Sequence, residues 1–410
     1  MNNPAWRFEG NERKYLEEVL STGFRAGADG AFTTRLESYF SDKYNVPYSI
    51  AFNSGTSTLH ATLLAMKCGP GDEILTPALT PLMCGLAPHY TGATPVFVDS
   101  TPDTFLMDPI DIERKITNKT KVIFVTHMYG AVCDMDAIMA IAKKNNLKVL
   151  EDCAQCYSAK HNNQISGTIG DIGSWSFENS KHLSCGDGGI VCLDDEEIAD
   201  YLRKLSTQGF KNATAKSGKI RVSKDLFQNP SYTRHSHYGF MYRLPEVAAA
   251  IGLAQVEKMK WFVDKRILMA SIYKEVISDL KCDWLIPQAT PEGDINSYYT
   301  FAAKMVNSDI KWADFRKKYV DFGGDGVYAA WTLCYREDSI DDILKRLKKI
   351  GYNGLKSSLG ILPKFKYHDG LCPNAEKVQT QLMQFTTNQK NIEEMKVQAD
   401  ILHKTISYFN

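Results

Sequence analysis

Two hydrophobic periods alternate along the first 250 residues of the chain. Residues 48–53, YSIAFN, form an apolar run typical of a buried strand, and a glycine turn follows it. Residues 56–66 then place Leu59, Leu63, Leu64 and Met66 at helical spacing. This stretch therefore predicts a strand, a turn and a helix.

The same alternation returns further along the chain. Short apolar runs predict strands, and the segment 135–146 between two of them predicts a helix; the runs are 72–77, 92–99, 121–130, 147–155, 173–178 and 188–194. Strands separated by helices of this length are typical of parallel βαβ units, whose functional sites lie at the carboxyl ends of the strands. We expect an α/β fold with a large, mostly parallel sheet.

The pattern changes after about residue 245. Residues 245–280 predict one or more long helices, residues 295–306 a strand, and residues 391–409 a C-terminal helix. We therefore expect a large domain over residues 1–262 and a smaller α+β domain over residues 263–410. Residues 211–239, polar and basic, read as a loop of the kind that is often functional.

Composition narrows the class of protein. The 410 residues exceed one typical domain, and 48 Lys plus Arg residues balance 48 Asp plus Glu residues, which argues against nucleic acid as the main partner. The start of the chain lacks the pattern of a signal peptide, and no apolar run reaches about 18 residues. We expect a soluble, cytoplasmic protein without a membrane partner.

The ten cysteines follow no regular spacing, which indicates reduced thiols rather than a disulfide framework. Cys153 and Cys156 form a C-x-x-C pair, for which a redox or zinc role is the alternative. A second pair at ligand spacing is missing from the sequence. We therefore expect buried thiols here and no metal site.

The candidate chemistry centres on Lys181, which stands between a polar turn and Gly186, Gly188 and Gly189. A lysine performs covalent carbonyl chemistry when its amine is neutral, although most surface lysines are simply solvated. The glycines allow the backbone to turn closely past the lysine. What distinguishes Lys181 is that candidate cofactor-binding residues stand at the ends of other predicted strands.

Three features accompany the lysine in chain order. Gly55 and Thr56 begin a predicted helix, where free N–H groups favour a phosphate. Asp152 ends a strand, where a carboxylate can keep a pyridine nitrogen protonated, and the hydroxyl of Ser176 can add a donor to the phosphate. Each feature alone also fits an ordinary turn or helix cap. Together they are what pyridoxal phosphate needs.

At this point the sequence resembles a known family. The matching segments are NSGTSTLHATLLAMKCGPGDEILTPALT, GATPVFVD, EDCAQ, GTIGDIGSWSFENSKHLSCGDGGIV, YRLPEVAAAIGLAQVEKM and CPNAEKV. They are similar to the DegT/DnrJ/EryC1/StrS family of pyridoxal phosphate-dependent sugar aminotransferases, and they extend to about residue 376. The resemblance implies the type I aminotransferase fold and a homodimer with active sites at the subunit interface.

The resemblance also implies roles for individual residues. Lys181 would bind the cofactor as a Schiff base, Asp152 would pair with the pyridine nitrogen, and Gln155 would lie near the cofactor's hydroxyl. The residues implied for the phosphate are Gly55, Thr56 and Ser176. Arg243 matches a position near the partner's active site.

His182 lies one residue from the position at which one branch of the family carries a histidine in place of the lysine. That branch dehydrates sugars, whereas this chain keeps the lysine. We group His182 with Arg243 as a candidate substrate contact without a catalytic role, and an ordinary polar residue in a turn is the simpler interpretation.

Two positions depart from the family pattern. Pro81 stands where an aromatic residue commonly covers one face of the cofactor, so aliphatic packing must replace that face. Met241 stands where an asparagine commonly reaches the phosphate across the dimer. We expect weaker cofactor retention or a substitute donor from the preceding loop, with Asn229, His235 and His237 as candidates.

The expected activity is a two-stage amino transfer from L-glutamate or L-glutamine to a keto sugar, in amino sugar biosynthesis. Residues 211–238 contain six lysines and arginines but only one acidic residue, Asp225. A loop with this excess of positive charge would suit the diphosphate of a nucleotide-linked sugar, and an ordinary solvated surface loop is the alternative. A dehydratase or lyase and a regulatory sensor that binds the cofactor without turnover are the competing functions. A nicotinamide enzyme is excluded because no G-x-G-x-x-G follows the first strand.

Overall fold

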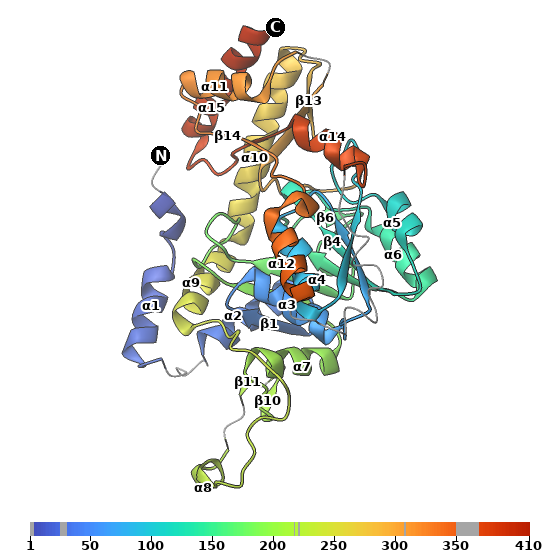
Figure 1. Cartoon of the computed structure of the whole chain (residues 1–410). Helices are drawn as coiled ribbons and strands as arrows, with labels where there is room; N and C mark the ends of the chain where they lie inside the picture. The colour runs from blue at the N-terminus through green and yellow to red at the C-terminus, as the bar shows by residue number, and fades with distance from the viewer. Residues whose placement is uncertain (1–3, 25–30, 217, 220–221, 307–308, 350–368) are drawn as a thin grey trace.

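The computed structural model describes residues 4–24, 31–216, 218–219, 222–306, 309–349 and 369–410 (Figure 1). A seven-stranded sheet lies at its centre, in the order β1-β9-β8-β5-β4-β2-β3. The strands are β1 (Tyr48–Phe52), β2 (Glu73–Pro77), β3 (Thr94–Val98), β4 (Thr120–Thr126), β5 (Lys148–Asp152), β8 (Ile172–Ser176) and β9 (Gly189–Leu193). Five of them lie inside a run that the hydrophobic pattern predicts, whereas β4 and β8 begin one residue before the predicted runs 121–130 and 173–178.

The sheet is mostly parallel, with one reversed strand. β2 pairs in parallel with β3 and β4, and β5 pairs in parallel with β4 and β8. β9 runs antiparallel between β1 and β8, with Gly189 opposite both Phe52 and Ser176. β1 and β8 therefore end where β9 begins, and the segment 177–188 lies at that edge of the sheet.

Alternate residues of the strands supply two separate hydrophobic cores, because successive side chains in a strand point to opposite faces. In β4, Ile123 and Val125 belong to one core, whereas Val122 and Phe124 belong to the other. The first core packs under α2 (Phe32–Tyr44), α5 (Pro109–Lys115), α6 (Met135–Asn145) and α9 (Glu246–Glu257). The second packs under α3 (Gly55–Ala65), α4 (Leu82–Thr91) and α7 (Glu196–Ser206). Both faces of the sheet are thus covered.

A smaller antiparallel sheet lies towards the C-terminus, in the order β12-β13-β15-β14. Its strands are β12 (Leu285–Pro287), β13 (Phe301–Met305), β14 (Val327–Ala329) and β15 (Leu382–Phe385), and its core includes residues of α10 (Met259–Asp279), α11 (Trp312–Asp321) and α15 (Ile392–Phe409). The predicted boundary at residues 262 and 263 falls inside α10, which extends from α9 to the small sheet (Figure 1). The division into two domains stays a prediction.

The C-terminal part also contributes to the larger core. Ala330, Cys334, Cys372 and Ala375 are buried in the same cluster as β4 and β5 residues. The remaining elements are η1 (Pro4–Phe8), α1 (Glu12–Ser21), η2 (Met128–Gly130), β6 (Lys160–His161), β7 (Gln164–Ile165), η3 (Cys334–Arg336), α12 (Asp338–Lys349) and α14 (Pro373–Gln381).

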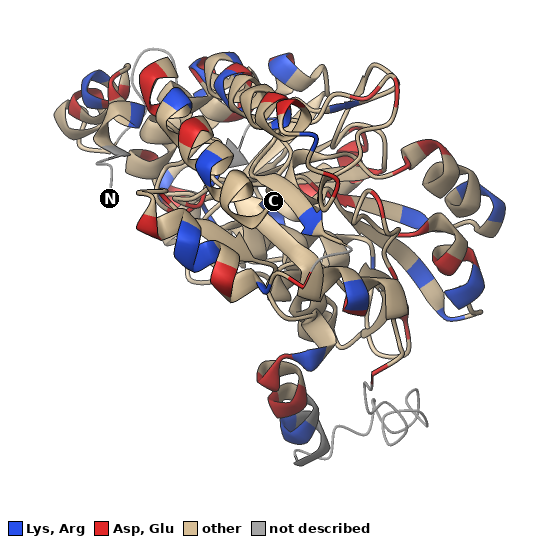
Figure 2. Cartoon of the chain, turned by 90° about the horizontal axis from the view of Figure 1, so that it is seen from above, with Lys and Arg blue, Asp and Glu red and all other residues tan. Residues whose placement is uncertain are grey.

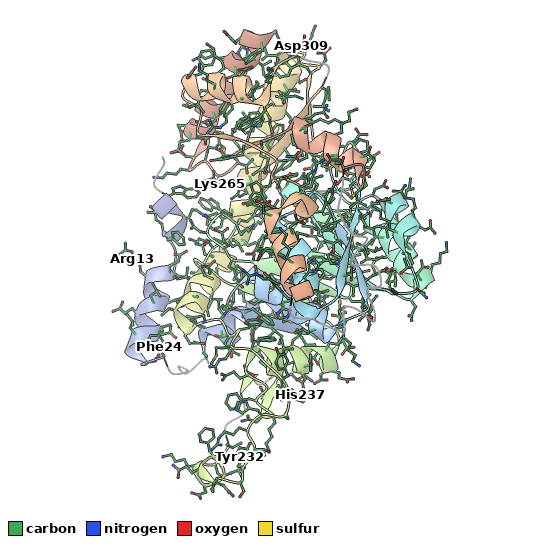
Figure 3. The ribbon with its side chains drawn as sticks, in the orientation of Figure 1. Arg13, Phe24, Tyr232, His237, Lys265 and Asp309 are labelled. Atoms are coloured by element: carbon green, nitrogen blue, oxygen red, sulfur yellow. The ribbon has the colours of Figure 1, made fainter. Side chains whose placement is uncertain are left out.

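The polar segment after α7 projects from the body of the molecule (Figure 1). We call the described residues between 211 and 240 the arm. It contains the short β10 (Ala213–Thr214) and β11 (Gly218–Lys219) and the single-turn helix α8 (Lys224–Gln228), which the prediction of a loop missed. Figure 3 shows Tyr232 and His237 on this arm.

Charges of both signs are interspersed over the molecule in Figure 2, in agreement with the balanced composition. Within the described parts of the chain, no helix combines the length and the apolar character needed to cross a membrane.

Candidate active site

Lys181 lies in the segment that connects β8 to β9. Its backbone N–H donates to the carbonyl of Glu178 at 3.0 Å, and its own carbonyl accepts from Arg7 Nη2 at 2.6 Å. The side chain is half-buried, and its Nζ lies 5.0 Å from the centre of the Tyr299 ring. The lysine is thus held by its backbone while its amine faces an aromatic ring.

Two of the glycines after the lysine meet a geometric requirement. Gly186 has φ +90°, in the left-handed region that favours glycine. A Cβ atom at Gly189 would lie 2.7 Å from the carbonyl oxygen of Ser54, so only glycine lets β9 begin this close to the start of α3. The tight return brings the Lys181 segment next to the turn at residues 53–56.

Asp152 ends β5 on the face of the sheet covered by α3 and α4. Its side chain is almost completely buried, and it accepts from the N–H of Ala154 at 2.9 Å and from the thiol of Cys84 at 3.2 Å. Burial raises the pKa of Asp152, while these two donors and the charge of Lys181 oppose the rise. No cation of the described residues lies within ion-pair distance of this carboxylate. A buried carboxylate in this state fits a cationic ligand atom.

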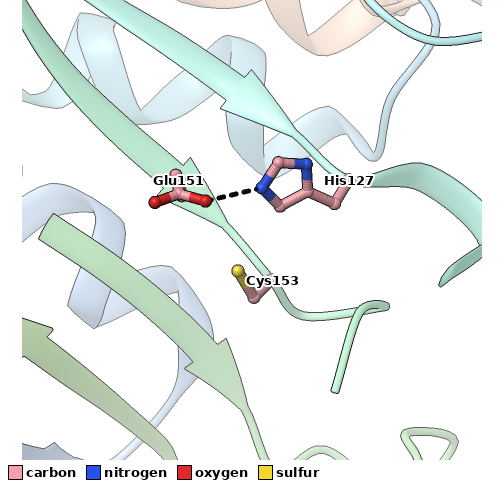
Figure 4. A group of neighbouring side chains, drawn as sticks. All are labelled: His127, Glu151 and Cys153. Carbon is pink, nitrogen blue, oxygen red and sulfur yellow. Dashed lines mark hydrogen bonds and ion pairs between the residues drawn. The ribbon is translucent and has the colours of Figure 1, made fainter. Parts of the chain in front are cut away.

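Glu151 points to the opposite face, because neighbouring residues in a strand alternate. Together with His127 and Cys153 it forms a buried group that has the residue types of a metal site (Figure 4). Glu151 already accepts from the N–H groups of Gly167, Ile169 and Gly170 and from His127 Nε2, the last at 2.9 Å.

The other ring nitrogen of His127, Nδ1, accepts from the N–H of Cys133 at 3.1 Å, so the ring is the neutral Nε2–H tautomer. The carboxylate and both ring nitrogens are therefore occupied by protein hydrogen bonds, and we assign this group a structural role.

The turn at the start of α3 forms an open donor site. Ser54 caps the helix by accepting from the N–H of Ser57 at 3.1 Å, and the N–H groups of Gly55 and Thr56 form no hydrogen bond to a described residue. A Cβ at Gly55 would lie 2.9 Å from Ser176 Oγ, so this hydroxyl lies directly beside the turn. Free N–H groups, the positive end of a helix dipole and a hydroxyl together fit a phosphate.

Gln155 connects this edge of the sheet to a large cavity. Its side chain is buried, and its Oε1 accepts from the N–H of Tyr129 at 2.9 Å. A cavity of about 1030 Å³ extends from Gln155 and Thr80 past Tyr299 to Gln384 beside the small sheet. The structure thus brings Lys181, Asp152, Gln155, Ser176 and the Gly55 turn to one edge of the large sheet. Of these residues Gln155 lines the cavity, and so do Asn179 and Ser180, which precede Lys181 in the chain.

The two predicted substrate contacts, His182 and Arg243, differ in exposure. The His182 side chain is fully buried, its Nε2 lies 3.0 Å from the carbonyl of Ser297, and burial, followed by the charge of Arg266, holds its pKa well below the ordinary value. The ring has no exposed surface that a substrate could reach, so this geometry does not favour the prediction of a substrate contact.

Arg243 is exposed and lies next to the turn at the start of α3. Its backbone forms a bridge with Phe52, and its Nη2 lies 3.1 Å from the sulfur of Met241. Met241, the residue in place of the expected asparagine, is 50% exposed. The three substitute candidates Asn229, His235 and His237 are exposed on the arm, and none of them lines the cavity of their own chain.

The predicted basic loop uses several of its charges internally. Lys216 pairs with Glu196 at 2.9 Å, and Arg234 lies 4.8 Å from the centre of the Phe227 ring. Arg221 lies outside the described residues. Pro81 is half-buried as the residue before α4, next to Leu79 and Thr80 in the cavity wall.

Sequence reasoning missed four residues of the site: Arg7, Cys84, Arg266 and Tyr299. One of them carried a signal, because Arg266 stands on the buried stripe of α10 formed by Phe262, Met269 and Tyr273. A charged residue on an apolar helix face is unusual and points to a specific role. The contacts of Arg7, Cys84 and Tyr299 arise between distant parts of the chain and leave no local pattern.

Comparison with known proteins decides the family. The model of the DegT/DnrJ/EryC1/StrS aminotransferase family matches residues 7–321. The chain belongs to this family. The family prediction and the expectation of an aminotransferase are therefore confirmed.

Named relatives share about a third of the aligned residues. GDP-perosamine synthase of Escherichia coli O157:H7 is 37% identical over 271 residues, which cover 66% of this chain and 70% of that protein. UDP-N-acetyl-3-dehydro-alpha-D-glucosamine 3-aminotransferase of Acidithiobacillus ferrooxidans is 35% identical, with coverage of 67% and 69%. Both names refer to nucleotide-linked sugars.

A solved structure confirms the fold. The aminotransferase from Psychrobacter cryohalolentis superposes with a TM-score of 0.80 at 24% identity, and the match covers 97% of each chain. The predicted type I aminotransferase fold, with its large mixed sheet and a smaller sheet towards the C-terminus, is confirmed.

Proposed function

We propose that this protein is a pyridoxal phosphate-dependent aminotransferase that transfers an amino group from L-glutamate or L-glutamine to a nucleotide-linked keto sugar, in amino sugar biosynthesis. Family membership and the two named relatives support the reaction and the class of acceptor. We place the protein in the cytoplasm, where thiols stay reduced; all ten cysteines are free in the structure.

The observation that carries the proposal is the buried Asp152 carboxylate, which lies at the same sheet edge as Lys181 and forms no ion pair with a cation of the described residues. The surrounding residues fit pyridoxal phosphate. Asp152 would hold its ring nitrogen, Gly55, Thr56 and Ser176 its phosphate, and Gln155 its hydroxyl. When bound, this cofactor serves as an electron sink that stabilises negative charge on a substrate carbon.

Lys181 performs two tasks in this proposal. Its amine would hold the aldehyde cofactor covalently until a substrate amine takes its place. The released Nζ would then take the proton from the substrate's α-carbon and deliver it to the former aldehyde carbon of the cofactor. Tyr299 limits the positions of Nζ through the contact of its ring, and Ser180 Oγ lies 2.8 Å from the Tyr299 hydroxyl. Asp152 would hold the ring nitrogen in its protonated form during this transfer.

We further propose a homodimer in which the arm of one subunit lies against the active site of the other. The arm projects from its own chain and carries exposed Leu226, Phe227 and Tyr238, which suit burial against a partner. His235, His237 or Asn229 would then supply the donor that Met241 lacks. Light scattering would measure the dimer, and unchanged cofactor affinity in the triple alanine variant would exclude these donors.

The absorbance spectrum of the purified protein with pyridoxal phosphate tests the central proposal. We expect a visible band of the lysine-bound cofactor in the wild type and in Lys144→Ala, a surface control, and no such band in Lys181→Ala. L-glutamate should bleach the band, and a keto sugar nucleotide should restore it.

A band that no amino donor bleaches would contradict the transfer reaction and favour the sensor. Absence of any band in the wild type would contradict the cofactor assignment. A keto sugar nucleotide that loses a hydroxyl group instead of gaining an amine would favour the dehydratase, which the retained Lys181 argues against.

A further inference from the structure

Two arginines that are far apart in the sequence line the same cavity. Arg7 belongs to the short helix η1 near the N-terminus and is 4% exposed, and Arg266 belongs to α10 and is 5% exposed. Both line the cavity that also contacts Gln155 and Tyr299. Two guanidinium groups are therefore almost completely withdrawn from water at one wall of the cavity.

Neutral protein atoms accept the hydrogen bonds of both guanidinium groups. Arg7 donates from Nη1 to the carbonyl of Asn179 at 2.8 Å, and from Nη2 to the carbonyls of Lys181 at 2.6 Å and His182 at 3.2 Å. Arg266 donates from Nη1 to the carbonyl of Tyr299 at 2.6 Å and to Thr387 Oγ1 at 3.0 Å. Its Nε and Nη2 form no hydrogen bond to a described residue.

No carboxylate of the described residues forms an ion pair with either arginine. Glu178 is the acid whose charge raises the pKa of Arg7, yet its Oε2 accepts from the backbone N–H of Ser180 at 3.0 Å. Asp325 also lines the cavity, but its carboxylate accepts from Thr386 and Gln389. Glu394 lines the cavity as well, and no ion pair among the described residues joins it to either arginine.

The two arginines also repel each other. Burial and then the charge of Arg7 lower the pKa of Arg266, and burial lowers the pKa of Arg7. Withdrawing like charges from water is unfavourable unless an anion compensates them. Arginine is suited to that anion because its planar fork binds carboxylate and phosphate through two parallel hydrogen bonds.

We infer that Arg7 and Arg266 form the subsite for an oxyanion of the substrate. This inference rests on the proposed function, in which two substrates carry such a group: the amino donor has a carboxylate and the nucleotide-linked acceptor has a diphosphate. The Tyr299 ring lies 5.0 Å from Lys181 Nζ and 5.8 Å from the Arg266 Cζ atom, so the subsite adjoins the reactive amine. The oxyanion would fix the substrate while its other end reaches Lys181.

Isothermal titration of the full chain, saturated with pyridoxal phosphate, tests the subsite without requiring turnover. The two probes are glutarate, a dicarboxylate that has no amine to transfer, and inorganic pyrophosphate. The variants are Arg7→Gln and Arg266→Gln, and the matched control is Lys260→Gln, which removes an exposed charge on the same helix as Arg266. Arg266→Lys keeps the charge and loses the fork.

We expect the wild type and the control to bind at least one probe, and each arginine-to-glutamine variant to bind it about tenfold to hundredfold more weakly. Arg266→Lys should retain part of the affinity. Selective loss of glutarate binding assigns the subsite to the donor, and selective loss of pyrophosphate binding assigns it to the acceptor.

Equal affinity in all variants, or absence of binding of both probes to the wild type, would overturn the inference. If Arg266→Gln does not fold, two measurements still test the subsite. One is probe binding to Arg7→Gln, and the other is the salt dependence of binding to the wild type, because binding of an anion to the arginine pair must weaken as ionic strength rises. If the protein forms no cofactor band, the proposed function fails, whereas the same titration without pyridoxal phosphate still reports on the arginine pair.

Discussion

The side-chain nitrogen Nζ of Lys181 lies 5.0 Å from the centre of the Tyr299 ring, a contact between residues 118 positions apart in the chain. The ring limits the positions that Nζ can take, and a contact of this kind is worth about 0.5–2 kcal/mol. We therefore expect Tyr299→Leu to lower the rate of amino transfer by about 2- to 30-fold. Tyr299→Phe keeps the ring and should stay near the wild type. Single-turnover absorbance with L-glutamate measures both, and equal rates in Leu and Phe variants would contradict a positioning role of the ring.

Replacement of Asp152 should separate cofactor binding from catalysis. Asp152→Asn keeps an oxygen that accepts from Ala154 but removes the negative charge. We expect the variant to bind pyridoxal phosphate and to lose about 10²- to 10³-fold in kcat, as when other preorganised electrostatic contacts are removed. Steady-state kinetics with saturating cofactor checks this result, and wild-type turnover would disprove the assignment.

A methyl group at Gly55 should disturb the phosphate site. A Cβ at this residue would lie 2.7 Å from the Cβ of Ser176 and would push the hydroxyl away from the helix start. We expect Gly55→Ala to weaken pyridoxal phosphate binding by at least about tenfold, the loss of one charge-assisted hydrogen bond. The control is Gly69→Ala, where the nearest atom is 4.0 Å from the added carbon. Equal dissociation constants in fluorescence titration would place the phosphate elsewhere.

The His127 and Glu151 pair should be structural and independent of metal. Glu151→Gln weakens four hydrogen bonds inside the protein, so we expect the free energy of unfolding to fall by about 3 kcal/mol. Glu113→Gln, which alters an exposed pair, should have little effect. Thermal unfolding with and without EDTA should give the same midpoint, and a lower midpoint in EDTA would indicate a bound metal ion.

The buried His89 of α4 should make the protein sensitive to acid. Burial lowers its pKa to about 4, and its Nε2 has no hydrogen-bond partner among the described residues. The unfolded state therefore binds a proton that the folded state excludes, so stability falls as pH decreases from about 6.5 to about 4.

We expect His89→Leu to reduce this loss by about 3 kcal/mol, since each tenfold difference in proton affinity corresponds to about 1.4 kcal/mol. Urea unfolding at a series of pH values measures the effect, with the exposed His403→Gln as control. The same slope in wild type and His89→Leu would show that other groups cause the acid sensitivity.

The local pattern of hydrophobic residues was sufficient to predict the strands of the large sheet. The runs at 48–53 and 147–155 contain β1 and β5, because a strand buried on both faces must be apolar throughout. The reversed direction of β9 was not predictable, since an apolar run reads the same in either direction. The helix α8 was not predicted, because its five residues are too few to show a helical period of hydrophobic positions.

The candidate site divides in the same way. Lys181, Asp152, Gln155, Ser176 and the Gly55 turn follow strands or begin a helix, so chain order and the rule of carboxyl ends are enough to bring them to one edge. No sequence pattern predicted the residues that contact them. Cys84 of α4 donates to Asp152, and Arg7 donates to the Lys181 carbonyl, 174 residues away in the chain. His182 and Lys181 are neighbours in sequence, yet only the fold shows that the histidine is buried.

The sequence by itself determined the alternation of strands and helices, the balance of charge, and the order in which a phosphate turn, a carboxylate and a lysine meet one sheet edge. These properties depend on periodicity and on local backbone preference, which neighbouring residues carry. The tertiary structure decided which acid faces the site, which cations line the cavity and which buried groups lack a partner. Burial and the pairing of charges depend on contacts between distant segments, and those contacts exist only once the chain is packed.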